Sequence, residues 1–313
     1  MPLRLLVDTD LGSDADDALA LLQLLGEPQV ELVGVTTVYG PADLRARLAR
    51  RLLDAAGCRA PVVAGAREPL GSPIPIWLTG REGAGVLDER DLARPLAEEG
   101  IGEEADELLV ERILAEPGEL TLLCLGPLTN LARALRLEPA IAGAVRAVVL
   151  MGGGIAPPCS APPRLPKGAV YPAPPSHNVR CDVRAAQLVL AAPFARLSMV
   201  TNGVTERLLW RGEGLKALLE RPRTPAAALV ARLVAEWLRF IGHDAEQGLV
   251  PHDPLAAAEA CGHSFTTVAR GRMEFLDGGE SVFAVDPAGP HAVAWRADAE
   301  RFLSWFSERM GAS

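Results

Sequence analysis

The order of apolar segments along the chain is the feature that most limits its fold. Short runs rich in Val, Ile and Leu alternate with segments whose apolar residues recur at helical spacing. We expect strands at 3–8, 30–38, 61–64, 119–124, 145–151 and 196–201, and helices at 16–25, 42–57, 105–116, 128–136 and 182–191. Runs such as Ala147 to Leu150 are apolar throughout, as in a parallel sheet covered on both faces. The pattern predicts an α/β fold, with an open, mostly parallel sheet flanked by helices, formed by residues 1–313 as a single domain.

Five aspartates lie within ten residues directly after the first predicted strand. They are Asp8, Asp10, Asp14, Asp16 and Asp17. Because side chains alternate along a strand, we expect Asp8 and Asp10 to share one face, and the following turn can bring the other three back towards them. A hard divalent cation relieves the repulsion among such carboxylates, and Ca²⁺ accepts irregular carboxylate geometry more readily than Mg²⁺. The cluster therefore predicts a metal site.

Helix capping is the alternative explanation for part of this cluster. An aspartate at the start of a helix binds free amide groups and complements the helix dipole without any metal. Capping would account for Asp14, Asp16 or Asp17, but it leaves Asp8 and Asp10 unexplained.

Polar or glycine-rich segments also follow several other predicted strands. They are residues 36–40, 125–130 and 151–154. Each segment alone is a weak signal, because such turns commonly follow strands. In open α/β sheets, however, ligands bind beyond the carboxyl ends of the strands. The coincidence predicts one site at that edge of the sheet.

Composition and charge limit the partners. The 313 residues are 49% apolar, and 31 basic against 40 acidic residues give a formal charge of −9. Nucleic acid and anionic membranes would not attract such a chain, so we expect neither as a partner and favour a small-molecule ligand. Five scattered cysteines without metal-like spacing indicate a reducing compartment. With an N-terminal apolar run too short for a secretory signal, we expect a cytoplasmic protein.

Two later regions carry further predictions. Residues 156–177 hold eight prolines without periodicity, which predicts a long loop that is a lid or disordered. Residues 205–262 have a helical pattern, and the segment 224–246 presents Trp237, Phe240 and His243 at helical spacing. Trp237 and Phe240 are candidate substrate-binding residues in a helical wall of the site, although such stripes more commonly pack in a core.

Several motifs together resemble one enzyme family. They are Asp8-Thr9-Asp10-Leu11-Gly12, Asp16-Asp17-Ala18-Leu19-Ala20-Leu21, Val35-Thr36-Thr37-Val38-Tyr39-Gly40, Leu125-Gly126-Pro127-Leu128-Thr129-Asn130, Met151-Gly152-Gly153-Gly154, Asn178 and His252-Asp253-Pro254. In order and spacing, over about 245 positions, the chain resembles the inosine-uridine preferring nucleoside hydrolases. The family's α/β fold agrees with the predicted strands and helices.

The resemblance implies Ca²⁺-dependent hydrolysis of the N-glycosidic bond of ribonucleosides, giving free base and ribose. Asp10, Asp17 and Asp253, with the main-chain carbonyl of Leu125, would bind the ion. Ca²⁺ would lower the pKa of a bound water, and Asp10 would act as the general base that takes its proton. The reaction would parallel inverting glycoside hydrolysis.

The resemblance also implies substrate contacts. Asp16 and Asn178 match ribose-binding positions, and Met151 matches a residue of the sugar pocket. His252 matches the residue that helps protonate the departing base, which an ordinary histidine pKa near 6.5 would allow at neutral pH; the structural alternative for His252-Asp253 is an ordinary helix start. Homodimers and homotetramers are common in the family.

The chain departs from the family pattern at specific positions. The usual D-x-D-P-G-x-D-D is here D-T-D-L-G-S-D-A-D-D, two residues longer, so Asp14 could replace Asp16 or Asp17. Pro41 stands where a ribose-contacting Asn is common, Thr79 where a His is usual, and Ser176 where a Glu commonly contacts the 5′-hydroxyl. The hypothesis is that the metal chemistry is retained while 5′ or base specificity differs.

Two other functions fit part of the sequence. A haloacid-dehalogenase-like phosphatase would use Asp8 as nucleophile with Mg²⁺, but it needs a lysine after a strand, and the chain has only Lys167 and Lys216. A nucleoside- or sugar-binding protein with little turnover would need neither a base at Asp10 nor an acid at His252.

Overall fold

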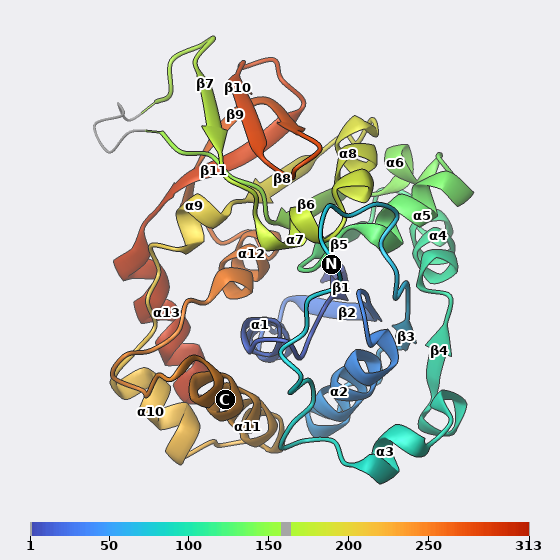
Figure 1. Cartoon of the computed structure of the whole chain (residues 1–313), viewed down its shortest axis with the longest axis vertical. Helices are drawn as coiled ribbons and strands as arrows, with labels where there is room; N and C mark the ends of the chain where they lie inside the picture. Colours follow the sequence, from blue (N-terminus) through green and yellow to red (C-terminus); the bar gives the residue numbers. More distant parts are fainter. Residues whose placement is uncertain (1, 158–163, 313) are drawn as a thin grey trace.

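A single mixed sheet of eleven strands runs through the computed structural model, which describes residues 2–157 and 164–312. The strand order is β4-β3-β2-β1-β5-β6-β8-β11-β9-β10-β7, and helices flank the sheet (Figure 1). The predicted α/β fold with an open, mostly parallel sheet is confirmed.

The parallel part of the sheet contains every predicted strand. It is formed by β4 (Ile101–Glu103), β3 (Val62–Ala64), β2 (Val30–Thr37), β1 (Leu3–Thr9), β5 (Leu120–Cys124), β6 (Ala147–Met151), β8 (Leu197–Val200) and β11 (His291–Ala297). Strands β2 to β4 extend from one side of β1, and β5, β6 and β8 extend from the other. The order of the chain therefore reverses between β1 and β5, the point at which open α/β sheets form a crevice for ligands.

An antiparallel extension that the sequence did not predict continues the sheet. It is formed by β9 (Thr266–Phe275), β10 (Ser281–Val285) and β7 (Val170–Ala173), at the top of Figure 1. The prediction of a structureless proline-rich loop was wrong in part, because β7 lies within it and pairs with β10. Pro172 is tolerated there since β7 is an edge strand, where a missing amide donor costs no ladder hydrogen bond. Residues 158–163, including Cys159, lie outside the described residues.

The predicted helices are present, with ends shifted by at most a few residues. They are α1 (Asp16–Leu25), α2 (Ala42–Ala55), α4 (Ala105–Ala115), α5 (Thr129–Leu137) and α8 (Val183–Ala191), with α11 (Pro225–Ile241) and α12 (His252–Ala260) in the region expected to be helical. The remaining helices are α3 (Glu89–Ala93), a 3₁₀ helix (Leu96–Glu99), α6 (Ile141–Ala144), α7 (His177–Cys181), α9 (Asn202–Thr205), α10 (Glu213–Glu220) and α13 (Ala299–Ala312). Within residues 2–157 and 164–312, no helix combines the length and the apolar character that crossing a bilayer requires.

Side chains of the central strands alternate between two apolar cores. Leu5 and Val7 of β1 contribute to the core beneath α1, α2, α11 and α12, whereas Leu6 contributes to the core beneath α4, α5 and α8. This alternation follows from the period of two along a strand, and it explains why the run from Leu5 to Val7 is apolar on both faces of the sheet. The sheet therefore separates two helical layers.

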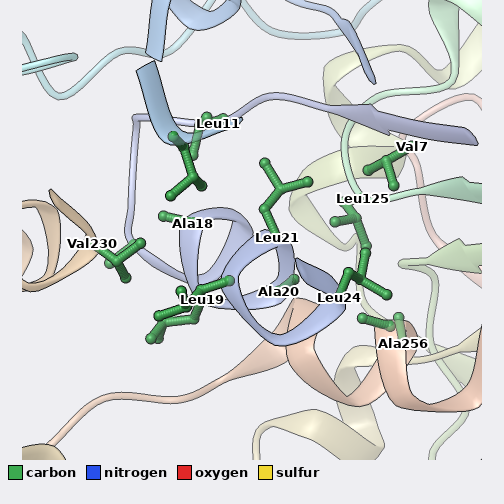
Figure 2. Packing of buried hydrophobic residues seen from close by; sticks show 14 of the residues in the cluster. Val7, Leu11, Ala18, Leu19, Ala20, Leu21, Leu24, Leu125, Val230 and Ala256 are labelled. Atoms are coloured by element: carbon green, nitrogen blue, oxygen red, sulfur yellow. The ribbon is translucent and has the colours of Figure 1, made fainter. Parts of the chain in front are cut away.

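Helix α1 is buried almost completely, and its start carries two of the candidate site residues. Its segment from Ala18 to Leu24 is buried, and it packs against α11 and α12. Figure 2 shows Leu19 and Leu21 among apolar side chains that include Val230 of α11 and Ala256 of α12. Because the helix is fixed on all sides, the positions of Asp16 and Asp17 are fixed with it.

Candidate active site

A cavity of about 190 Å³ lies at the carboxyl ends of β1, β5 and β6, where the strand order reverses. It is lined by Asp10, Ser13, Asp14, Asp16, Asp17, Trp77, Leu125, Met151, His177, Asn178, Asn202, His252 and Asp253. Every residue predicted as a catalytic residue or metal ligand is among them, as are Asp16, Met151 and Asn178 of the predicted substrate contacts. The structure thus brings together segments that are up to about 240 residues apart in sequence.

One side of the cavity, here called the acidic wall, consists of Asp10, Asp14, Asp16, Asp17 and Asp253. Oxygen atoms of Asp14, Asp16 and Asp17 lie within 4.8 Å of one another. The main-chain amide of Asp253 donates to Oδ2 of Asp16 over 3.3 Å, which joins the start of α12 to the start of α1. The hydroxyl of Thr9 donates to Asp17. The acidic wall therefore combines a loop with the first turns of two helices, where the helix dipole favours negative charge.

Burial and mutual repulsion disfavour the ionised forms of the carboxylates in the acidic wall. Burial, with the charge of Asp17 as a smaller contribution, raises the pKa of Asp16 to about 6. Burial, followed by the charges of neighbouring carboxylates, raises the pKa of Asp14, Asp17 and Asp253 well above the usual range. These groups offer hard oxygen donors, so the wall has the chemistry of a divalent-cation site, and a cation would remove the repulsion that raises the pKa values.

Asp8 does not line the cavity, although it was expected to join the aspartate cluster of the metal site. It is completely buried, and its Oδ1 accepts hydrogen bonds from Thr36 Oγ1 (2.6 Å) and Asn130 Nδ2 (2.7 Å). Burial raises the pKa of Asp8 to about 7. A buried carboxyl held in this way cannot act as the nucleophile of a phosphatase.

Asn178 connects the strand ends behind the cavity. Its Nδ2 donates to the carbonyl oxygens of Leu125 and, over 3.1 Å, Met151. The Leu125 carbonyl, predicted as a metal ligand, therefore faces the cavity but already accepts a hydrogen bond. The Oδ1 of Asn178 is the atom of this side chain left to bind a ligand in this arrangement.

His252 begins α12 and lines the cavity next to Asp253. Its Nδ1 lies 2.7 Å from Oγ1 of Thr205. Burial lowers the pKa of His252 to about 4, with the charge of Glu206 opposing the shift. The expectation of an ordinary pKa near 6.5 was wrong, because the ring is removed from water. The imidazole is neutral at pH 7, so it can donate a hydrogen bond from a ring N–H but does not carry a positive charge.

Four other lining residues, here called the uncharged wall, have no charged side chain at neutral pH. They are Trp77, Met151, His177 and Asn178. Trp77 lies between β3 and α3, its side chain is 43% exposed, and its ring meets that of His177 edge to face at 5.5 Å. Burial lowers the pKa of His177, which keeps its ring neutral. Sequence reasoning missed Trp77 and His177; the position of His177 beside Asn178 was the available signal.

Asn202 and Ser13 also line the cavity and were not predicted. Asn202 follows β8, so the rule that ligands bind beyond strand ends could have found it. Among the described residues, its buried Oδ1 has no hydrogen-bond partner. An unpartnered buried acceptor at the edge of a cavity is available to a ligand.

Trp237 and Phe240 do not line the cavity, which differs from the prediction. Their rings stack at 5.6 Å, and they border a much smaller pocket that shares only Ser13 and Asp14 with the cavity. Phe240 is 43% exposed, so the pair is not an internal core either. Helix α11 thus forms a wall of the adjoining pocket, while α12 supplies the helical wall of the cavity itself.

None of the three positions that depart from the family pattern lines the cavity. Pro41 precedes α2, and Thr79 borders the smaller pocket, where its amide and hydroxyl bind Glu82. Ser176 is buried, and its hydroxyl accepts a hydrogen bond of 2.8 Å from the amide of Gly153. The family's usual polar contacts from these positions are therefore absent from the cavity lining.

Comparison with known proteins agrees with this geometry. The family model described as inosine-uridine preferring nucleoside hydrolase matches residues 5–304. The chain belongs to this family. It is 32% identical to the inosine-uridine preferring nucleoside hydrolase of Leishmania major over 276 residues, covering 86% of this chain and 82% of the relative. It is 27% identical to uridine nucleosidase 1 of Arabidopsis thaliana, covering 98% of this chain and 93% of the relative.

Solved structures of this nucleoside hydrolase family share the fold. A plant nucleoside hydrolase superposes with a TM-score of 0.77 at 25% identity over 100% of both chains. A purine-preferring ribonucleoside hydrolase from Gardnerella vaginalis superposes with a TM-score of 0.75 at 22% identity, covering 99% of this chain and 98% of that one. The similarity therefore extends over the complete sheet and its helical layers.

Proposed function

We propose that this nucleoside hydrolase cleaves the N-glycosidic bond of ribonucleosides with Ca²⁺ as cofactor, giving free base and ribose. The observation that carries the proposal is one cavity lined by both the carboxylates of the acidic wall and the side chains of the uncharged wall. Carboxylates can hold a cation and accept a proton, while the neutral wall can contact an uncharged substrate. Family membership gives the reaction class, and the cavity residues give each step a candidate group.

The cation would be held by Asp10, Asp17 and Asp253, with the Leu125 carbonyl as a further ligand. The Leu125 carbonyl can take this role if the amide of Asn178 turns towards the substrate. A divalent cation bound here supplies a water of lowered pKa and a charge that attracts the ribose hydroxyls. Asp14 is the additional carboxylate of this chain, and its proximity to Asp16 and Asp17 makes it a further candidate ligand.

Asp10 would act as the general base. Its side chain lines the cavity directly after β1, and its main-chain carbonyl accepts a hydrogen bond from Arg45, which fixes its position. A carboxylate placed in this way accepts the proton of the attacking water as the bond to the anomeric carbon forms. Asp16 and Asn178 would bind ribose hydroxyls, and Met151 would contact the sugar.

His252 would assist departure of the base. Because its imidazole is neutral at pH 7, it would donate a hydrogen bond from a ring N–H to the departing base, and the ring itself would stay neutral. Thr205 Oγ1 binds the other ring nitrogen and orients the ring. Trp77 at the mouth of the cavity offers an aromatic face for the base.

Release of reducing sugar from a panel of nucleosides tests this proposal. The panel contains inosine, uridine, adenosine and cytidine, and each is also supplied as the 5′-deoxy form because the usual 5′ contact is absent from the cavity lining. We expect ribose release that stops on chelation and returns with Ca²⁺, and a small penalty for 5′-deoxy substrates. Ca²⁺ binding without hydrolysis of any nucleoside would contradict the proposal and favour a binding protein.

A further inference from the structure

Arg45 of α2 is completely buried beside the acidic wall. Its Nε donates to the carbonyl of Tyr39 (2.7 Å), its Nη1 to the carbonyls of Asp10 and Leu11 (3.1 Å for Leu11), and its Nη2 to Oγ of Ser13 (2.9 Å). All four acceptors are neutral oxygens. Burying a guanidinium is costly unless its donors are satisfied, so an arginine that is buried to hold main-chain carbonyls indicates a demand for fixed geometry.

The segment that Arg45 holds is the longer loop of this chain. Three of its four acceptors lie in residues 10–13, between β1 and α1, where the chain is two residues longer than the family pattern. Gly12 has φ of 111°, and a Cβ there would meet Leu48 of α2 at 2.6 Å, so the loop lies directly against the helix. A longer loop has more conformations available, and the planar guanidinium removes several of them at once.

The fourth acceptor connects Arg45 to the uncharged wall. Tyr39 has a left-handed conformation with φ of 71°, which is strained for a residue with a side chain. Its carbonyl binds Arg45, and its hydroxyl accepts a hydrogen bond of 2.8 Å from the amide of Trp77. One side chain therefore joins the loop of the acidic wall to the residue that positions Trp77.

Arg45 is also a permanent positive charge close to the carboxylates. Its charge lowers the pKa of Asp14 and Asp17, against the larger effects of burial and of neighbouring carboxylates. Because a guanidinium stays protonated, this charge is present whether or not a cation is bound.

We propose that Arg45 is a positioning residue for the cation site: it fixes the main chain of residues 10–13 so that Asp10 and Asp14 meet Asp16 and Asp17. This inference rests on the proposed function, because it concerns the same cation. A residue that served stability alone would change the melting temperature and leave cation affinity unchanged. Arg45 is expected to change the affinity.

The test is calorimetric titration of metal-free protein with Ca²⁺, comparing wild type with Arg45→Lys. Lysine keeps the charge but cannot span four acceptors, so the variant isolates positioning from electrostatics. We expect the dissociation constant for Ca²⁺ to rise roughly tenfold or more, the scale of one lost charge-assisted hydrogen bond. Unchanged affinity would overturn the inference. Failure of wild type to bind Ca²⁺ would instead contradict the proposed function.

Two further variants keep the test decisive. Arg47→Lys is the matched control, because Arg47 is also buried on α2 but pairs with Glu99 and the Arg94 carbonyl. It should lower the melting temperature without changing Ca²⁺ affinity. Ser13→Ala removes one acceptor at a partly exposed position, so it should fold even if Arg45→Lys does not, and it should weaken binding about threefold. Wild-type affinity in Ser13→Ala, or equal weakening in Arg47→Lys, would overturn the inference.

Discussion

Asp16 and Asp17 of the acidic wall and Trp77 of the uncharged wall lie on different kinds of structure. Asp16 and Asp17 begin a helix that is buried from Ala18 to Leu24, whereas Trp77 lies in a segment without regular structure and is 43% exposed. Asp16 and Asp17 thus lie on a part of the molecule that cannot move without disturbing the core. Trp77, which would meet the base, lies where a substitution costs little stability.

The largest expected effect comes from breaking the acidic wall. Asp17→Asn should abolish measurable Ca²⁺ binding and slow ribose release roughly 10³-fold. The reason is that the variant loses a buried carboxylate that is one of the proposed ligands of the cation. Initial rates with saturating nucleoside measure the loss. Asp298→Asn is the control, since Asp298 also lies at a helix start, before α13, but outside the cavity. If Asp17→Asn had an activity close to that of wild type, the proposed chemical role of the acidic wall would be contradicted.

Next in size is the effect of replacing His252, which also lines the cavity. His252→Ala should slow hydrolysis of nucleosides about 100-fold. The loss of rate should be much smaller for a riboside whose leaving group departs as a stable phenolate, because that group needs no assistance. Since burial lowers the pKa of His252 to about 4, its ring is neutral above that pH, and the rate should show no step from this residue between pH 6 and 8. If the rate of wild type fell as the pH rose through 6.5 and this fall were absent in His252→Ala, the claim that His252 acts as a neutral donor would be contradicted.

The stability of the metal-free protein tests the repulsion within the acidic wall. The folded pKa of Asp16, about 6, exceeds its unfolded value near 3.8, so the charged form destabilises the fold at pH above 6 and the penalty disappears as pH falls towards 4. In chelator at pH 8, Asp16→Asn should therefore be more stable than wild type by about 1–3 kcal/mol. Thermal melts from pH 4 to 8 measure this advantage, which should shrink at low pH and reverse in Ca²⁺. Lower stability of the variant at pH 8 would argue against repulsion.

The smallest effects belong to the aromatic residues. Trp77→Ala should raise KM roughly tenfold while changing kcat less than about threefold, because it removes contact with the base and leaves the chemistry in place. Phe240→Ala should change neither constant more than about twofold, since Phe240 borders only the smaller pocket. Steady-state kinetics with inosine and uridine distinguish the two. A larger increase in KM for Phe240→Ala than for Trp77→Ala would indicate that the base binds against α11.

The parallel sheet and the acidic wall were predictable from the sequence because both depend on local signals. Apolar runs marked the strands, and the strand ends marked the edge at which Asp10, Leu125 and Met151 now meet. Asn178 and His252 were predicted only through the resemblance to the family. The antiparallel strands were missed because β9 interrupts its apolar positions with Arg270, Gly271 and Arg272, which gives neither a helical nor a continuous apolar pattern. Asp8 was misplaced because its carboxyl is buried and held by Thr36 and Asn130, contacts that the sequence pattern does not reveal.

The uncharged wall was less predictable for a physical reason. The position of Trp77 depends on a hydrogen bond from its amide to the hydroxyl of Tyr39, and that of Asn178 on carbonyls of two different strands. Contacts between irregular segments have no periodicity that a sequence pattern could reveal. The same holds for Arg45, which is one of many arginines in the sequence and is distinguished only by what it contacts in the fold.

The most direct test of the account compares wild type with Asp10→Ala in ribose release from inosine and uridine, in Ca²⁺ and after chelation. We expect wild type to release ribose only with Ca²⁺, and Asp10→Ala to lose roughly 10³-fold or more of that rate while keeping its fold by circular dichroism. Turnover in Asp10→Ala at the wild-type rate, or wild-type turnover that is indifferent to chelation, would contradict the assignment of the acidic wall as the site of hydrolysis.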